Sequence, residues 1–141
     1  MRRFIGRFVL AFVVSFGLLL PVSAEELLND DRALLASPWK GYWISPKGFL
    51  FTANVRLRIA QNNSVEGEIA WVMERSPREE DKPKLGLSAT EHVRGSYDPR
   101  ARVLRLEGYR KDDPNQVIGL DKYHLVLADS NQVLGGITWD H

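Results

Sequence analysis

Side chains that could carry out chemistry are few and scattered in this chain. It has no cysteine, and its three histidines are His92, His124 and His141. A zinc site needs three or four converging ligands, so we expect surface histidines and no metal. The chain also has no Gly-x-Ser-x-Gly elbow, no His-Glu-x-x-His pair and no glycine-rich phosphate loop. We therefore expect no catalytic residue, no cofactor and no enzyme activity.

Carboxylates are numerous, and Glu66, Glu68 and Glu91 fall within predicted strands. The first two have arginine partners across a predicted hairpin. A catalytic acid needs an apolar setting, which an exposed ion pair does not provide. An enzyme with a site on the rim of the fold is therefore only our third hypothesis.

Composition and charge are those of one globular domain. The chain has 141 residues, of which 44% are hydrophobic and 26% charged. The formal net charge is +1, but Arg2, Arg3 and Arg7 precede every acidic residue. Without residues 1–24, 16 lysines and arginines stand against 18 acidic residues, a net charge of −2. Such a domain has no basic excess to attract a phosphate backbone, so we expect no nucleic-acid partner.

Residues 1–24 resemble a secretory signal peptide. Three arginines come before the apolar run from Phe8 to Leu20, and Val22-Ser23-Ala24 has the small residues of a cleavage site. A membrane span needs about 20 apolar residues, so we expect cleavage after Ala24 and no span in the mature chain. Export without disulfides suits a periplasmic or secreted protein. We expect a polar lead-in over residues 25–37, with one helical turn capped by Asp31, and a single domain over residues 38–141.

Everything after Pro38 has the pattern of β-structure, with short alternating segments separated by turn residues. We expect charged loops over residues 76–84 and 111–115. The predicted strands lie near residues 39–45, 49–59, 65–74, 88–98, 103–110, 118–128 and 133–139.

Three hairpins have a register that can be predicted from their side chains. A loop at residues 61–63 pairs Arg58 with Glu66 and Leu57 with Gly67. A four-residue loop at 99–102 pairs Arg94 with Glu107 and Gly95 with Leu106. A loop at Asp129-Ser130-Asn131 pairs Leu127 with Val133, Leu125 with Gly135 and Tyr123 with Ile137. In each hairpin a large inward side chain meets a glycine.

Consecutive hairpins predict an all-β antiparallel meander that closes into a small barrel or stays open as a half-barrel. The stretch Gly41-Tyr42-Trp43 resembles the Gly-x-Trp motif of the calycin group, which includes lipocalins and avidins. That resemblance implies a barrel with Trp43 packed across one end, near a turn at Leu34-Leu35. The group's biotin-contacting residues have no match here, so the resemblance implies no biotin.

A small barrel either fills its interior or holds one small ligand. Glycines opposite leucines favour a filled interior. The alternative is a lipocalin-like carrier of a small apolar ligand, whose pocket would be lined by Trp43, Trp71, Tyr123 and Trp139.

The outer face of the predicted sheet carries more apolar residues than a solvated face needs. They include Tyr42, Val72, Val103, Tyr109 and Val126, and such a patch can mark an interface. The charged loop at residues 76–84 is a second contact candidate. We therefore expect an exported, non-catalytic binding protein whose partner is a protein or an envelope component.

Overall fold

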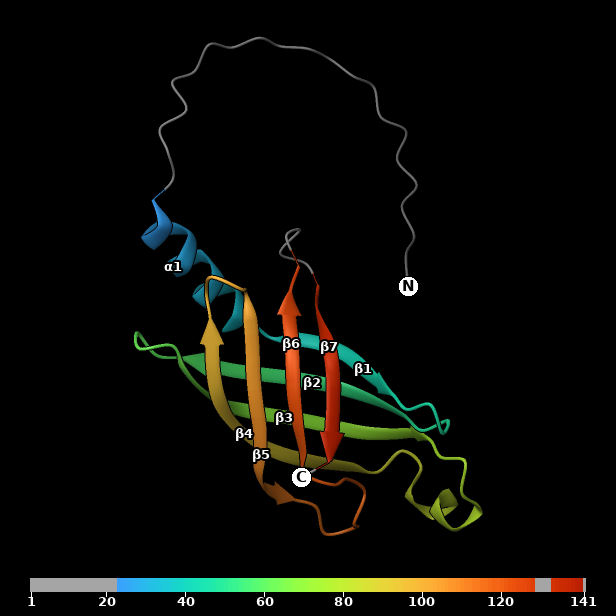
Figure 1. Ribbon diagram of the computed structural model, residues 1–141. Coiled ribbons are helices and arrows are strands. Elements are labelled where there is room, and N and C mark those ends of the chain that lie inside the picture. Colours follow the sequence, from blue (N-terminus) through green and yellow to red (C-terminus); the bar gives the residue numbers. More distant parts are fainter. Residues whose placement is uncertain (1–22, 129–132, 141) are drawn as a thin grey trace, which may run out of the picture.

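The computed structural model describes residues 23–128 and 133–140, and they form one curled antiparallel sheet with a helix at one end (Figure 1). Seven strands follow one another in chain order, so each pairs with its neighbours in sequence. They are β1 (Trp39–Ile44), β2 (Leu50–Ile59), β3 (Ser64–Arg75), β4 (Ser88–Asp98), β5 (Val103–Asp112), β6 (Asp121–Leu127) and β7 (Leu134–Asp140).

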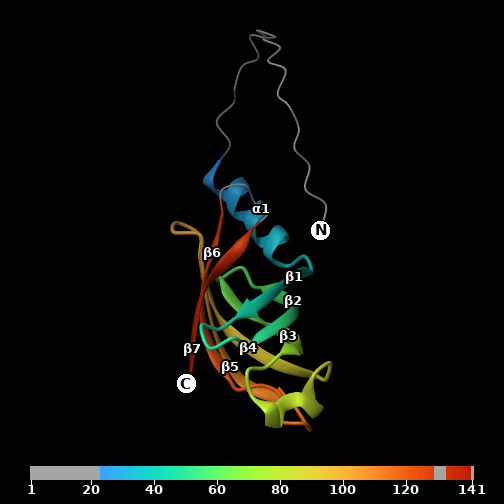
Figure 2. The same cartoon turned by 90° about the vertical axis from the view of Figure 1, so that its right-hand side faces the viewer.

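The meander stays open as a half-barrel, which was one of the two forms predicted. Strands β6 and β7 curl round to face β1 to β3 (Figure 2). An odd number of antiparallel strands leaves the first and last running parallel, and β1 is not hydrogen-bonded to β7 as a strand. One side-chain bond joins these two strands: Trp43 Nε1 donates to Thr138 Oγ1 over 2.8 Å.

Two of the three predicted hairpin registers are confirmed. Arg58 pairs with Glu66 and Leu57 with Gly67 across β2 and β3, and Arg94 pairs with Glu107 and Gly95 with Leu106 across β4 and β5. Asn63 has φ 65°, the left-handed conformation that the short β2–β3 loop requires.

The predicted register of the last hairpin is wrong by one residue. Leu127 pairs with Leu134, Leu125 with Gly136 and Tyr123 with Thr138. The proposed loop, Asp129-Ser130-Asn131, lies outside the described residues. A slip of one residue turns every side chain of a strand to the other face. Gly136 is therefore the inward glycine, and Ile137 and Trp139 are exposed by 67% and 47%.

The lead-in is a longer helix than predicted. Helix α1 (Ala24–Leu35) begins after Ser23, whose hydroxyl accepts a hydrogen bond from Glu26 N at 3.1 Å. Glu25 and Glu26 in its first turn complement the helix dipole. Asp31 is therefore not a cap but a residue of the third helical turn.

Two charged residues of α1, Asp31 and Arg32, fix the helix to the hairpin ends. The Asp31 carboxylate accepts hydrogen bonds from Tyr97 Oη at 2.6 Å and from Arg102 Nη2 at 2.7 Å. Arg32 donates to Gln61 O at 2.6 Å and to Asn63 Oδ1 at 2.9 Å. Leu35 is fully buried in the core. The helix thus covers the end of the half-barrel where the β2–β3 and β4–β5 loops lie (Figure 1).

The opposite end is formed by the longer connections. Residues 76–84, expected to be an irregular loop, contain a short 3₁₀ helix, η1 (Glu79–Lys84). The β5–β6 connection runs over residues 113–120, so β6 starts three residues later than predicted. Asp113 fixes this connection by accepting from Val117 N at 2.8 Å and Ile118 N at 3.0 Å. No helix among the described residues is long and apolar enough to cross a membrane.

Candidate functional site: an aromatic pocket around Glu91

A cavity of about 310 Å³ opens at the end of the half-barrel opposite α1. The sequence favoured a filled interior, and that expectation holds only for the α1 end. Several segments meet at the cavity: inward positions of β1 to β4, the β1–β2 connection, the η1 connection, the β5–β6 connection and the ends of β6 and β7. It is lined by Trp43, Phe49, Phe51, Trp71, Met73, Arg78, Asp81, Lys84, Glu91, Gln116, Val117, Ile118, Gly119, Asp121, Tyr123 and Asp140.

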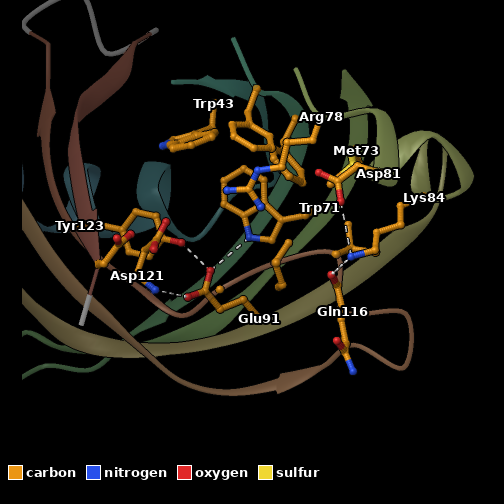
Figure 3. Close-up of a pocket in the computed structure, with 16 residues that line it drawn as sticks. Trp43, Trp71, Met73, Arg78, Asp81, Lys84, Glu91, Gln116, Asp121 and Tyr123 are labelled. Carbon is orange, nitrogen blue, oxygen red and sulfur yellow. Dashed lines mark hydrogen bonds and ion pairs between the residues drawn. The ribbon is translucent and has the colours of Figure 1, made fainter. Parts of the chain in front are cut away.

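The floor of the pocket carries a buried carboxylate, Glu91, which is 1% exposed. Its Oε2 accepts hydrogen bonds from Trp71 Nε1 at 3.1 Å and from the Tyr123 hydroxyl, and its Oε1 accepts from Asp121 N at 3.1 Å (Figure 3). Burial and the neighbouring negative charge of Glu91 raise the pKa of Tyr123 far above its ordinary value. The phenol therefore stays protonated and keeps donating.

Two local features place Glu91 inside, the alternation of β4 and the open space opposite it in β5. The register shifts next to Glu91, because Val93 pairs with Gly108 and His92 with Arg110, so that Tyr109 is the extra residue of a bulge in β5. In the neighbouring strand β5, Gly108 leaves the space that the Glu91 carboxylate occupies, because a Cβ there would lie 1.9 Å from Glu91 Oε1. A side chain at that position would therefore occupy the place of the carboxylate.

Aromatic rings form the pocket wall on the β1–β3 side. Trp43 and Phe51 meet edge to face with ring centroids 5.8 Å apart, and Phe51 and Trp71 do so at 6.3 Å. The indole N–H groups of Trp43 and Trp71 are both bonded, to Thr138 and to Glu91. The rings are thus held in fixed orientations.

Charged side chains of the η1 connection form the rim. Lys84 Nζ lies 3.6 Å from Asp81 Oδ1 and donates to Gln116 O at 2.9 Å, which ties η1 to the β5–β6 connection. Arg78 lies over the ring of Phe49, 5.1 Å from its centroid. The hydrogen bond from Ser76, assisted by Lys84, keeps the pKa of Asp81 below its usual value despite burial.

Three of the four predicted pocket residues lie together. Trp43, Trp71 and Tyr123 all line the cavity. Trp139 does not, because the register of β7 turns it to the outer face. Trp43 lies at the open end rather than beside Leu34 and Leu35, so the end-plug position that the calycin resemblance implied for it does not apply.

The predicted interface residues are spread over the outer face. Tyr42 is 72% exposed on β1, and Val126 is 45% exposed on β6. Tyr109 is exposed on β5 with the Arg94 guanidinium 5.2 Å from its ring centroid. Val72 is half-buried, and Val103, which pairs with Val126, is buried.

The central residue of the pocket, Glu91, received no role from the sequence. The sequence pattern did indicate that Glu91 is buried, because Ala89, Val93 and Tyr97 share its parity in the strand and are all buried. A carboxylate in line with three buried residues predicts a buried charge.

The described residues include no group of three or more histidines and acids placed to hold a metal. His92 lies on the outer face, with Nε2 2.6 Å from Asp112 Oδ2. Comparison with known protein families, with curated proteins and with solved structures found no match.

Proposed function

We propose that this chain is an exported, non-catalytic binding protein whose pocket holds a small organic molecule. The single observation that carries the proposal is the cavity of about 310 Å³ with aromatic walls and a buried carboxylate. Ligand pockets of about 300–1,000 Å³ are mostly apolar, with a few placed polar groups. This cavity is near the lower limit, which suits a small ligand of up to about three rings.

The hydrogen bonding of Glu91 supports binding rather than catalysis. A general acid or base must exchange a proton with its substrate. Both carboxylate oxygens of Glu91 already accept from the protein, from Trp71 and Tyr123 on one side and the Asp121 amide on the other. Such a group is fixed in place and suits recognition by charge.

The architecture supports a carrier similar to the calycin group. The curled antiparallel meander, the helix at one end and the pocket at the other form a cup with a closed base. The signal-like pattern of residues 1–24 supports export to the periplasm or the medium. Cleavage after Ala24 would also remove the Ser23 cap of α1.

A matched pair of tryptophan variants tests this proposal. N-Phenyl-1-naphthylamine is a neutral probe whose emission rises in apolar surroundings, and we expect the purified protein to bind it. Trp43→Ala removes a pocket wall and should weaken binding about ten-fold or more, whereas Trp139→Ala, on the outer face, should change it less than about two-fold. No binding by the wild type, or equal losses in both variants, would contradict the proposal.

A second candidate function uses the outer face. A groove of about 530 Å³ there includes Trp139, Arg105 and Lys122, and the β7 register exposes Ile137 beside it. An exposed tryptophan among arginines is typical of protein interfaces. If this face binds an envelope protein, Trp139→Ala should weaken that complex while leaving probe binding in the pocket intact.

A further inference from the structure

The charge of Glu91 is not balanced by a cation. Its three hydrogen-bond donors, an indole, a phenol and a backbone amide, are all neutral. None of the ion pairs found within residues 23–128 and 133–140 includes Glu91. Buried carboxylates are usually paired with a positive group. This one faces a cavity instead.

The other charges of the pocket wall add to this imbalance. Asp140 lines the cavity together with Glu91 and Asp81. Against these three carboxylates the wall has two cations, Lys84 and Arg78. Lys84 is engaged by Asp81 and Gln116, and the Arg78 guanidinium lies over the Phe49 ring. The wall therefore favours a positively charged occupant.

The aromatic rings favour the same kind of occupant. A cation near the face of a tryptophan, tyrosine or phenylalanine is attracted by the ring quadrupole, most strongly where water is excluded. Trp43, Phe51 and Trp71 form a continuous aromatic wall, and the indole of Trp71 is bonded to Glu91. Rings and carboxylate thus border one space (Figure 3).

From this geometry we infer that the ligand is an organic cation, with an amine or quaternary ammonium group on a small apolar body. The inference rests on the proposed function and adds the charge of the ligand. The positive group lies in the cavity against the rings of Trp43 and Trp71, close to the buried charge of Glu91, and the apolar body contacts Phe51 and Met73. An anionic ligand bound by Arg78 and Lys84 is the opposite outcome.

Three probes of similar shape distinguish the effect of ligand charge on affinity from the effect of apolar contact. They are phenyltrimethylammonium, its neutral isostere tert-butylbenzene, and benzenesulfonate as an anion. We expect calorimetry to show the cation binding about ten-fold or more tightly than the neutral isostere, and the anion more weakly than both. In NMR spectra, the indole N–H signal of Trp71 should shift as the cation binds.

Two glutamate variants locate the source of the preference. Glu91→Gln keeps the shape of the side chain and removes its charge, so the cation should lose most of its advantage over tert-butylbenzene. Glu66→Gln is the matched control, because Glu66 lies on the outer face with a 71% exposed side chain. It should leave the ratio of the two affinities unchanged. If Glu91→Gln does not fold, the ratio of the affinities for the cation and tert-butylbenzene is compared between the wild type and Asp140→Asn. Asp140 is exposed, so removing its charge should reduce this ratio about two-fold.

The outcomes distinguish the inference from the proposed function. Equal affinity for cation and neutral isostere, or tighter binding of benzenesulfonate, would overturn the cationic ligand while leaving a binding pocket. A cation preference that survives in Glu91→Gln would overturn the role of Glu91. Failure of all three probes and of N-phenyl-1-naphthylamine would overturn the pocket itself.

Discussion

At the residue scale, the pocket depends on a pair of positions on neighbouring strands, Glu91 and Gly108. The glycine is the reason that a carboxylate fits under the sheet, because a Cβ would lie 1.9 Å from Oε1 and 2.9 Å from Cδ. The Glu91 side chain could turn away from an added methyl group. Turning would break its bonds to Trp71, Tyr123 and Asp121, so the pair is coupled through those donors.

We predict that Gly108→Ala destabilises the protein by about 2–3 kcal/mol, the cost of leaving buried donors unpaired. Chemical denaturation measures the loss, and the Trp71 indole signal should report the broken bond. Gly41→Ala is the control, because a Cβ there meets nothing within 4 Å. In a Glu91→Ala background the cost of Gly108→Ala should fall by half or more. If the losses of unfolding free energy in the two single variants simply add in the double variant, the two positions are not coupled.

At the element scale, α1 is held on the half-barrel by Asp31, Tyr97 and Arg102. Burial, together with the hydrogen bond to Asp31, raises the pKa of Tyr97 to about 12. The folded state thus favours the protonated phenol, and this contribution to stability is fully present below about pH 10, the pKa of an unfolded tyrosine. It is lost as the pH rises from 10 towards 12.

Tyr97→Phe tests this linkage. Removing the hydroxyl should cost about 1–2 kcal/mol near pH 8, because the bond is to a charged group. The difference in unfolding free energy between wild type and variant should shrink as the pH rises through 10 to 12, since only the wild type has this phenol to ionise. Urea unfolding of both proteins at several pH values gives the difference, and other groups cancel in it. If the difference does not change with pH, ionisation of Tyr97 does not affect the stability with which α1 is held.

The strands show how far the sequence could predict the structure. Where charged pairs and glycine–leucine pairs agree on one register, as in Arg58–Glu66 and Leu57–Gly67, the prediction is confirmed residue by residue. The last hairpin has adjacent glycines, Gly135 and Gly136, so either could face Leu125 and the pattern did not discriminate. Three residues of the cavity wall, Trp43, Trp71 and Tyr123, were predicted, but strand pairing favoured a filled interior. The open volume arises where strand ends and connections diverge, and strand parity does not describe that geometry.

At the scale of the whole molecule, the pocket requires the two ends of the meander to approach each other. Trp43 of β1 and Asp140 of β7 line the same cavity, although six steps of the sheet separate their strands. The bond from Trp43 Nε1 to Thr138 Oγ1, 2.8 Å long, connects residues 95 positions apart. Because these strands share no backbone ladder, this contact has a large effect on how far the half-barrel closes.

We predict that Thr138→Val, which keeps the shape of the side chain but removes the acceptor, costs about 1 kcal/mol. Amide hydrogen exchange should accelerate in β1 and β7 while the central strands keep their protection. Binding of N-phenyl-1-naphthylamine should weaken, because Trp43 loses its fixed orientation. Thr52→Val is the matched control: Thr52 bonds Glu74 on the exposed face, so its loss should affect neither exchange at the edges nor binding. Unchanged exchange in β1 and β7 of Thr138→Val would mean that curvature of the sheet alone, without the side-chain bond, sets the width of the pocket.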